Sequence, residues 1–289
     1  MKFFVAVRGE LIKMFRQRGT YAGYALLFAL TALWVWGVWY GGSPADNISR
    51  GAGDEFAIGG STLTGPMMPY MMLEIPVAIN VFLPLLISMT AGGLIAAEAQ
   101  RGTLRTWLTR PISRGTVISS KLVAGGLHAM TLVIFLGAIS LASGYIVFGG
   151  GDLISISMGP MEDDGGAKFR ILAEPQALQR LAIGYGLVAV TMLSVVALAM
   201  LCSTIFEHPL TASGVTVGFL IVSVALMVIP AFEWLQPYLL VSHFHSYRAV
   251  FQKIIDWPRI WEDLTWVGIY TTTAIAITAL VFARRDMTC

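Results

Sequence analysis

The sequence contains few charged residues. Aspartate, glutamate, lysine and arginine together make up 12% of its 289 residues, whereas a soluble globular domain carries about 25%. Hydrophobic residues make up 56%. This composition excludes an ordinary water-soluble enzyme and indicates a chain that is embedded in a membrane.

Cysteine is also scarce, and the common catalytic motifs are missing. Cys202 and Cys289 are the only cysteines and form no C-x-x-C pair, so we expect reduced thiols rather than a disulfide framework. The sequence has no G-x-x-x-x-G-K-S/T phosphate loop, no H-E-x-x-H and no G-x-S-x-G. We therefore expect a protein that is not an enzyme, has no cofactor or metal of its own and binds no nucleic acid.

Long apolar runs dominate what is present. A membrane-spanning helix needs about 20 mostly apolar residues, and six runs reach that length. We predict an all-α membrane protein that forms a single transmembrane domain over residues 1–289. The predicted spans are about 21–40, 75–97, 117–147, 178–201, 211–231 and 264–282.

The positive charges are distributed unevenly between the two sides of these spans. If both termini lie in the cytoplasm, the inner segments hold twelve lysines and arginines but only four acidic residues. Lysine and arginine accumulate in the cytoplasmic loops of membrane proteins. We therefore predict a multi-pass protein of the cell (inner, cytoplasmic) membrane whose termini both face the cytoplasm.

The first 20 residues predict a helix that lies in the inner membrane surface. Apolar residues recur at helical spacing on one face, and basic residues lie around the other side. Alternatively, the segment is a charged flank that only orients the first span. The apolar face consists of Phe4, Val7, Leu11, Met14 and Phe15, and the basic side consists of Lys2, Lys13, Arg16 and Arg18.

A short basic segment, EAQRGTLRTWLTRPISRG at 98–115, separates the second and third runs. Leu104, Trp107 and Leu108 form an apolar stripe at helical spacing, and Pro111 disfavours helix at the residue before it. We predict a short amphipathic helix over about 98–110 that faces the cytoplasm. A soluble partner that grips this helix would move both attached spans; alternatively, the segment is a basic loop that only fixes the topology.

The sequence AAEAQRGTLRTWLTRPISRGTVISSKLVAG resembles the segment between spans two and three of ABC-2-type permeases, the membrane subunits of a class of ATP-driven exporters. RGELIKMFRQRGTY is similar to the family's entry helix through Glu10, Lys13 and Arg16, and FARRDM resembles its usual ending. The residues that match the first segment are Glu98, Gly102, Thr103, Leu104, Pro111, Ser113, Arg114 and Lys121.

This resemblance implies a permease subunit whose coupling helix docks on a separate nucleotide-binding ATPase subunit, which holds ATP and magnesium. It also implies a second permease chain, either identical or closely related. The rival class is an energy-independent integral membrane protein, such as a channel, a scaffold or an intramembrane enzyme. The substrate and any periplasmic accessory partner stay open. The residues implied in coupling are Glu98, Arg101, Gly102, Thr103, Leu104, Arg105, Arg110, Pro111 and Arg114.

Three polar residues are weak candidates for a transport pathway because polar groups within spans are costly and often functional. Glu74 and Asn80 lie near the outer start of the second span, where Pro76 and Pro84 can kink the helix. Alternatively, Glu74 contacts headgroups and Asn80 bonds a neighbouring helix. His128 lies in the third span beside small residues suited to close packing, and we expect a satisfied helix-contact residue rather than a ligand.

The outer segments are 41–74, 148–177 and 232–263. The last is rich in aromatic residues and predicts short helices on the outer membrane surface. Methionines and histidines in these segments could bind copper, although methionines near a membrane edge are more often packing residues. The residues concerned are Met67, Met68, Met71, Met72, His243 and His245.

Overall fold

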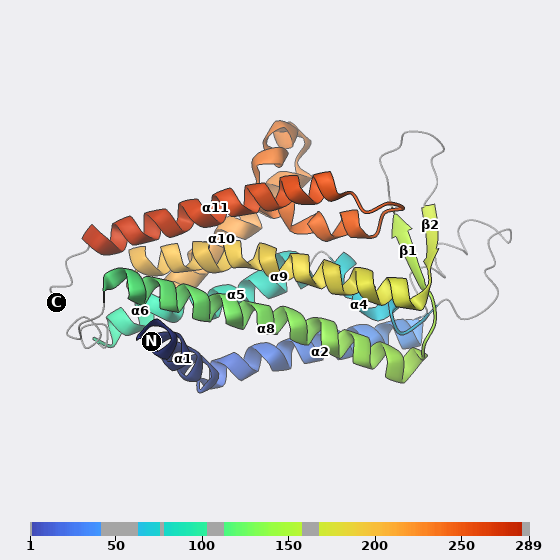
Figure 1. Ribbon diagram of the computed structural model, residues 1–289, viewed down its shortest axis with the longest axis horizontal. Helices are drawn as coiled ribbons and strands as arrows, with labels where there is room; N and C mark the ends of the chain where they lie inside the picture. Colours follow the sequence, from blue (N-terminus) through green and yellow to red (C-terminus); the bar gives the residue numbers. More distant parts are fainter. Residues whose placement is uncertain (1, 42–62, 76–77, 103–112, 158–167, 285–289) are drawn as a thin grey trace.

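A computed structural model describes residues 2–41, 63–75, 78–102, 113–157 and 168–284. Long helices run side by side along one axis (Figure 1), and six of them are long and apolar enough to cross a membrane. The all-helical membrane fold is therefore confirmed. Five of these spans are the single helices α2 (Arg18–Gly41), α8 (Arg114–Phe148), α9 (Glu174–Ile205), α10 (Pro209–Val228) and α11 (Trp257–Arg284).

The described ends of the chain lie at the same end of the bundle. Helix α1 (Lys2–Phe15) lies beside the start of α8, and α11 ends at that side too (Figure 1). An even number of spans requires this arrangement. We call this side, where α9 also ends and α10 begins, the inner end, in keeping with the orientation predicted from the charges.

The second span is the interrupted one. It covers Ala78–Gln100 and consists of a π-helical turn η2 (Ala78–Phe82), α5 (Leu83–Ala91) and α6 (Gly93–Gln100). A separate helix α4 (Met67–Glu74) precedes it, and Ile75 after α4 has an extended backbone. Pro84 has no N–H and crowds the carbonyl four residues earlier, which explains the irregular turn just before it. The predicted kink in this region is thus confirmed.

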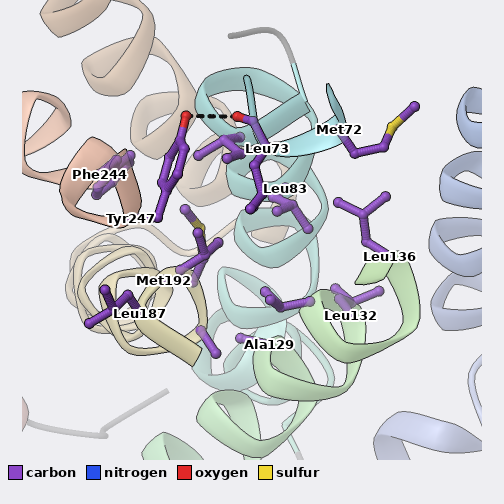
Figure 2. Close-up of a cluster of buried hydrophobic side chains, with 14 of the residues drawn as sticks. Met72, Leu73, Leu83, Ala129, Leu132, Leu136, Leu187, Met192, Phe244 and Tyr247 are labelled. Atoms are coloured by element: carbon purple, nitrogen blue, oxygen red, sulfur yellow. Dashed lines mark hydrogen bonds between the residues drawn. The ribbon is translucent and has the colours of Figure 1, made fainter. Parts of the chain in front are cut away.

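The hydrophobic core lies where α5, α8 and α9 meet the 3₁₀ helix η4 (Leu240–Val250). Gly125 and Gly126 let α8 approach α9 closely, since a Cβ on Gly126 would lie 3.0 Å from Leu193. Figure 2 shows leucines and methionines of four elements converging, and the Tyr247 hydroxyl donates to the Leu73 carbonyl at 2.7 Å. This packing agrees with the small residues noted in the third predicted span.

The outer end holds more structure than the sequence predicts. Helix α4 lies in a segment expected to be a loop, and two strands, β1 (Leu153–Ser157) and β2 (Lys168–Leu172), form an antiparallel pair between α8 and α9. Leu153 and Leu172 are both buried. The strands therefore add a small β element to the all-α fold at the outer end.

Two 3₁₀ helices connect α10 to α11, and only one of them is a surface element. The first, η3 (Pro230–Tyr238), has no buried residue and exposes Trp234 and Tyr238, as expected for a helix at the membrane surface. The second, η4 (Leu240–Val250), packs against α9 and α11 and buries most of its side chains. Helix η3 is thus exposed, as the prediction of outer-surface helices requires, and its position at the membrane surface stays a prediction, whereas η4 is packed inside the protein.

Helix α1 packs against α8 through most of the predicted apolar face, joined by the charged Glu10. Val7 and Met14 are buried together with Glu10, whereas Phe4 is 76% exposed. Val5 is exposed as well. Apolar spacing alone did not reveal that Glu10 belongs to the buried side and that Phe4 does not.

Candidate functional site

The basic segment between the second and third spans is held at both ends by identifiable caps. Gly102 has a φ of +69°, the left-handed conformation that ends helices and favours glycine. On the other side, the Ser113 hydroxyl accepts a hydrogen bond from the backbone N–H of Thr116 at 3.2 Å and caps the start of α8. The glycine and the serine of the permease-like segment therefore fix where the two helices stop and start.

The structure places only part of the expected coupling residues. Arg101 and Gly102 are exposed beyond the end of α6, and Arg114 is the first residue of α8. Glu98 belongs to the last turn of α6 rather than to a new helix, and residues 103–110 of the predicted coupling helix lie outside the described residues. Thr103, Leu104, Arg105, Arg110 and Pro111 lie outside the described residues.

Glu98 points into the protein and pairs with a buried lysine. The Glu98 carboxylate is 9% exposed, and its Oε2 lies 2.7 Å from the Nζ of Lys121, whose side chain is 1% exposed. Lys121 lies two turns into α8, so this ion pair joins the end of the second span to the start of the third. This ion pair lies close to the two capped ends of the basic segment, on the side that faces the helix bundle.

Helix α1 supplies the other half of the same cluster. Glu10, which is 2% exposed, places its Oε1 3.2 Å from the Nζ of Lys121 and 3.2 Å from the Nζ of Lys13. Lys13 also donates to the Glu98 carboxylate. We call Glu10, Lys13, Glu98 and Lys121 the four-charge cluster.

The charges of the four-charge cluster balance, as buried charges must. Burial of Lys13 disfavours its charged form, but the hydrogen bond to Glu98 and the charges of Glu10 and Glu98 outweigh it and raise the pKa of Lys13. The cluster therefore holds α1, α6 and α8 together through ionic bonds that are strong where water is excluded.

Sequence reasoning identified the members of this cluster separately but not their pairing. Glu10, Lys13, Glu98 and Lys121 each belong to a stretch that resembles the permeases. The one local signal is the spacing of Glu10 and Lys13, which lie three residues apart on a predicted helix. The contacts to Glu98 and Lys121 depend on how α1 packs.

A second set of polar contacts lies toward the outer end and includes two of the weak pathway candidates. Glu74 Oε2 lies 3.1 Å from Nη2 of Arg248, and the Asn80 amide nitrogen lies 3.4 Å from Nε2 of His245. One polar pair therefore joins α4 to η4, and the other joins the start of the second span to η4. Oδ1 of Asn80 is buried and has no hydrogen-bond partner within the described part of the chain.

Burial shifts the ionisation of this outer set. It raises the pKa of Glu74, against the opposing charge of Arg248. Burial and the neighbouring Arg248 lower the pKa of His245 to about 4. His245 is therefore neutral over the physiological range, and an unprotonated ring nitrogen can accept from the Asn80 amide.

The residues weighed as copper ligands have other contacts. His243 Nδ1 lies 2.8 Å from Asp263 Oδ1, and its Nε2 lies 3.2 Å from the Pro237 carbonyl. The ring also stacks on Trp266. The four methionines of α4 belong to the main hydrophobic core, as the packing alternative predicts. They are Met67, Met68, Met71 and Met72.

His128, the third weak pathway candidate, lies apart from the outer set. Its ring is 1% exposed and makes edge contacts with Phe15 and Tyr24. It is thus a helix-contact residue, but its Nδ1 has no hydrogen-bond partner among the described residues. The expectation that its hydrogen bonds are satisfied does not hold for this nitrogen.

Comparison with known proteins gives one family and one relative. The family model described as "Protein of unknown function (DUF2705)" matches residues 52–288. The uncharacterized protein YhcI of Bacillus subtilis (strain 168) is 24% identical over 200 residues, which cover 68% of this chain and 62% of YhcI. The chain thus spans less than two thirds of the length of that relative. Since the family match includes five of the six spans, the chain belongs to the DUF2705 family, and its six long apolar helices make it a multi-pass membrane protein.

Proposed function

We propose that this protein is the membrane subunit of an ATP-driven exporter of the ABC-2 type. A separate nucleotide-binding subunit supplies the energy and holds ATP and magnesium. A second permease chain, identical or closely related, completes the pathway. This chain carries out no reaction itself.

The observation that carries the proposal is the position of the four-charge cluster. Glu98 and Lys121 join the second and third spans directly below the two ends of the basic segment. A force applied to that segment in the cytoplasm is therefore delivered to both spans together. Because the cluster is buried, removal of any one partner leaves an uncompensated charge between the helices it joins.

The outer polar pairs give the other end of the proposed mechanism. In this conformation Glu74–Arg248 joins α4 to η4, and Asn80–His245 joins the start of the second span to η4. Displacement of the second span from the inner end strains these pairs at the outer end. The interruption between α4 and α5 is where the span bends, so the outer end opens without unfolding the inner half.

Co-purification tests the proposal first. The tagged chain, extracted in a mild detergent, is expected to bring down a protein with a G-x-x-x-x-G-K-S/T motif. Recovery of the chain without any such subunit, from cells that express the whole operon, would favour the energy-independent alternative.

Coupling is tested on that complex without knowledge of the substrate. Ile254, which is 81% exposed beyond η4, is replaced by cysteine in a chain that lacks Cys202 and Cys289. Its labelling rate is measured with and without a non-hydrolysable ATP analogue. We expect a nucleotide-dependent rate that Glu98→Gln abolishes.

The matched control is Glu207→Gln. Glu207 is an exposed acid between α9 and α10, also at the inner end. It should leave the nucleotide response intact. A response that survives Glu98→Gln in a complex that still binds its partner would contradict the coupling role.

A further inference from the structure

The folded position of α1 separates its charges. Glu10 is the only acid among residues 1–18, and the structure turns it inward to Lys121 and Lys13. The opposite side of α1 exposes Arg8, and Arg16 and Arg18 follow it. The charged side chains on the outward face are therefore all basic, although the segment as a whole also contains an acid.

The same face exposes large apolar side chains. Phe4, Val5 and Ile12 are 76%, 70% and 53% exposed, and they lie beside Arg8 on the side of the helix away from α8. A helix with apolar and basic side chains on one exposed face is suited to the boundary between headgroups and acyl chains. The basic side chains add attraction to anionic lipids.

We propose that this outward face of α1 binds anionic phospholipids of the inner leaflet. Through Glu10, this binding stabilises the contact of α1 with the inner ends of the second and third spans. The inference rests on the proposed function only for the side of the membrane on which α1 lies. The partner is a lipid surface because the exposed apolar residues need a hydrocarbon environment that a soluble anion does not provide.

Glu10 provides the link between lipid and spans. A lipid-bound α1 keeps Glu10 close to Lys121, which raises the effective concentration of one ion-pair partner at the other. Anionic lipid therefore stabilises the contact of Lys121 with Glu10. Without Glu10, α1 still binds lipid and Lys13 still donates to Glu98, but the direct ionic contact of α1 with Lys121 of α8 is lost.

Hydrogen exchange on the full chain in nanodiscs tests this without any ATPase subunit. Discs of phosphatidylcholine alone are compared with discs that also contain phosphatidylglycerol. We expect slower exchange in residues 3–15 and 113–121 with phosphatidylglycerol. Arg8→Gln/Arg16→Gln should weaken the binding of α1 to the anionic surface by roughly fivefold for each charge removed. The slowing of exchange should decrease accordingly.

Two further variants separate lipid binding from its transmission. Glu10→Gln should keep the lipid response of residues 3–15 and weaken that of 113–121, and an unchanged response of 113–121 would contradict the role of Glu10. Arg259→Gln, which removes an exposed charge at the outer start of α11, should change neither.

Equal exchange in the two lipids would overturn the proposal. A response that appears only when a nucleotide-binding subunit is added, whatever the lipid, would also overturn it, because α1 would then be a protein-docking face. The comparison of the two lipids needs no ATPase partner, so failure of the lipid proposal remains distinguishable from failure of the exporter proposal.

Discussion

Lys121 lies between two carboxylates from different parts of the chain, 2.7 Å from Glu98 Oε2 and 3.2 Å from Glu10 Oε1. Its side chain is 1% exposed. Water therefore cannot replace Lys121 as the partner of either carboxylate unless the helix contacts open. This lysine is the point at which α1, α6 and α8 become one unit. Its removal is accordingly the most direct perturbation of that unit.

Lys121→Met is expected to destabilise the protein by about 3–5 kcal/mol, because it leaves buried carboxylates without their main partner. Thermal unfolding in detergent measures the effect. Lys13→Met should cost much less, since Lys13 is 39% exposed. Lys121→Met/Glu98→Gln should recover part of the loss, and equal losses for Lys121→Met and Lys13→Met would show that burial does not set the energy.

Gly92→Ala is expected to destabilise the protein by about 1–3 kcal/mol through overpacking. A Cβ at Gly92 would lie 2.5 Å from the Ser213 hydroxyl of α10 and 2.7 Å from the Ser88 carbonyl. Gly93→Ala is the matched control, because nothing lies within 4 Å of a Cβ there. Unfolding of the two variants in the same detergent should separate them, and a harmless Gly92→Ala would mean that α6 and α10 are not in close contact.

Acidification is expected to weaken the protein through His245. Its pKa is about 4 in the folded protein against an ordinary value of 6.5, so the unfolded chain takes up a proton first. The stability contributed by neutral His245 is complete above pH 6.5 and is lost as the pH falls to about 4. The loss amounts to about 3 kcal/mol.

His245→Gln should flatten this dependence. Glu74 contributes with the opposite sign because burial raises its pKa. The difference between the wild-type and variant profiles is therefore the quantity to measure. Identical slopes between pH 6.5 and 4 would refute the burial of a neutral imidazole.

The predicted orientation is open to cysteine labelling. In a chain without Cys202 and Cys289, Ile171→Cys should react with an impermeant maleimide in intact cells, since Ile171 is 63% exposed on β2 at the outer end. Arg101→Cys should react only after permeabilisation. Reaction of Arg101→Cys in intact cells would place the basic segment outside, where no cytosolic ATPase could reach it.

The six spans could be predicted from the sequence because length and apolar composition alone determine whether a helix can cross a bilayer. The expected ends differ from the observed ones by a few residues, and most for α11, which begins at Trp257 rather than near 264. The disturbance around Pro84 was also predictable, because proline acts on its own helix.

The four-charge cluster could not be predicted, since Glu10, Glu98 and Lys121 are joined only by tertiary packing. The burial of η4 was missed for a related reason. Its apolar and aromatic residues suit a surface helix and a buried one equally well, and only the neighbouring α9 and α11 decide between them. The pairing of Arg248 with Glu74 and of His245 with Asn80 depends on that burial.

The helices differ greatly in length. At 1.5 Å per residue, the 20 residues of α10 extend about 30 Å, whereas the 35 residues of α8 extend about 52 Å. A change in bilayer thickness therefore acts unequally on them: α8 can tilt to accommodate it, but α10 has no surplus length and must pull its ends below the headgroups or thin the lipid around it. A change in the acyl-chain length of the host membrane should therefore change the tilt of α8 relative to α10. The bundle cannot adapt to bilayer thickness as a rigid body.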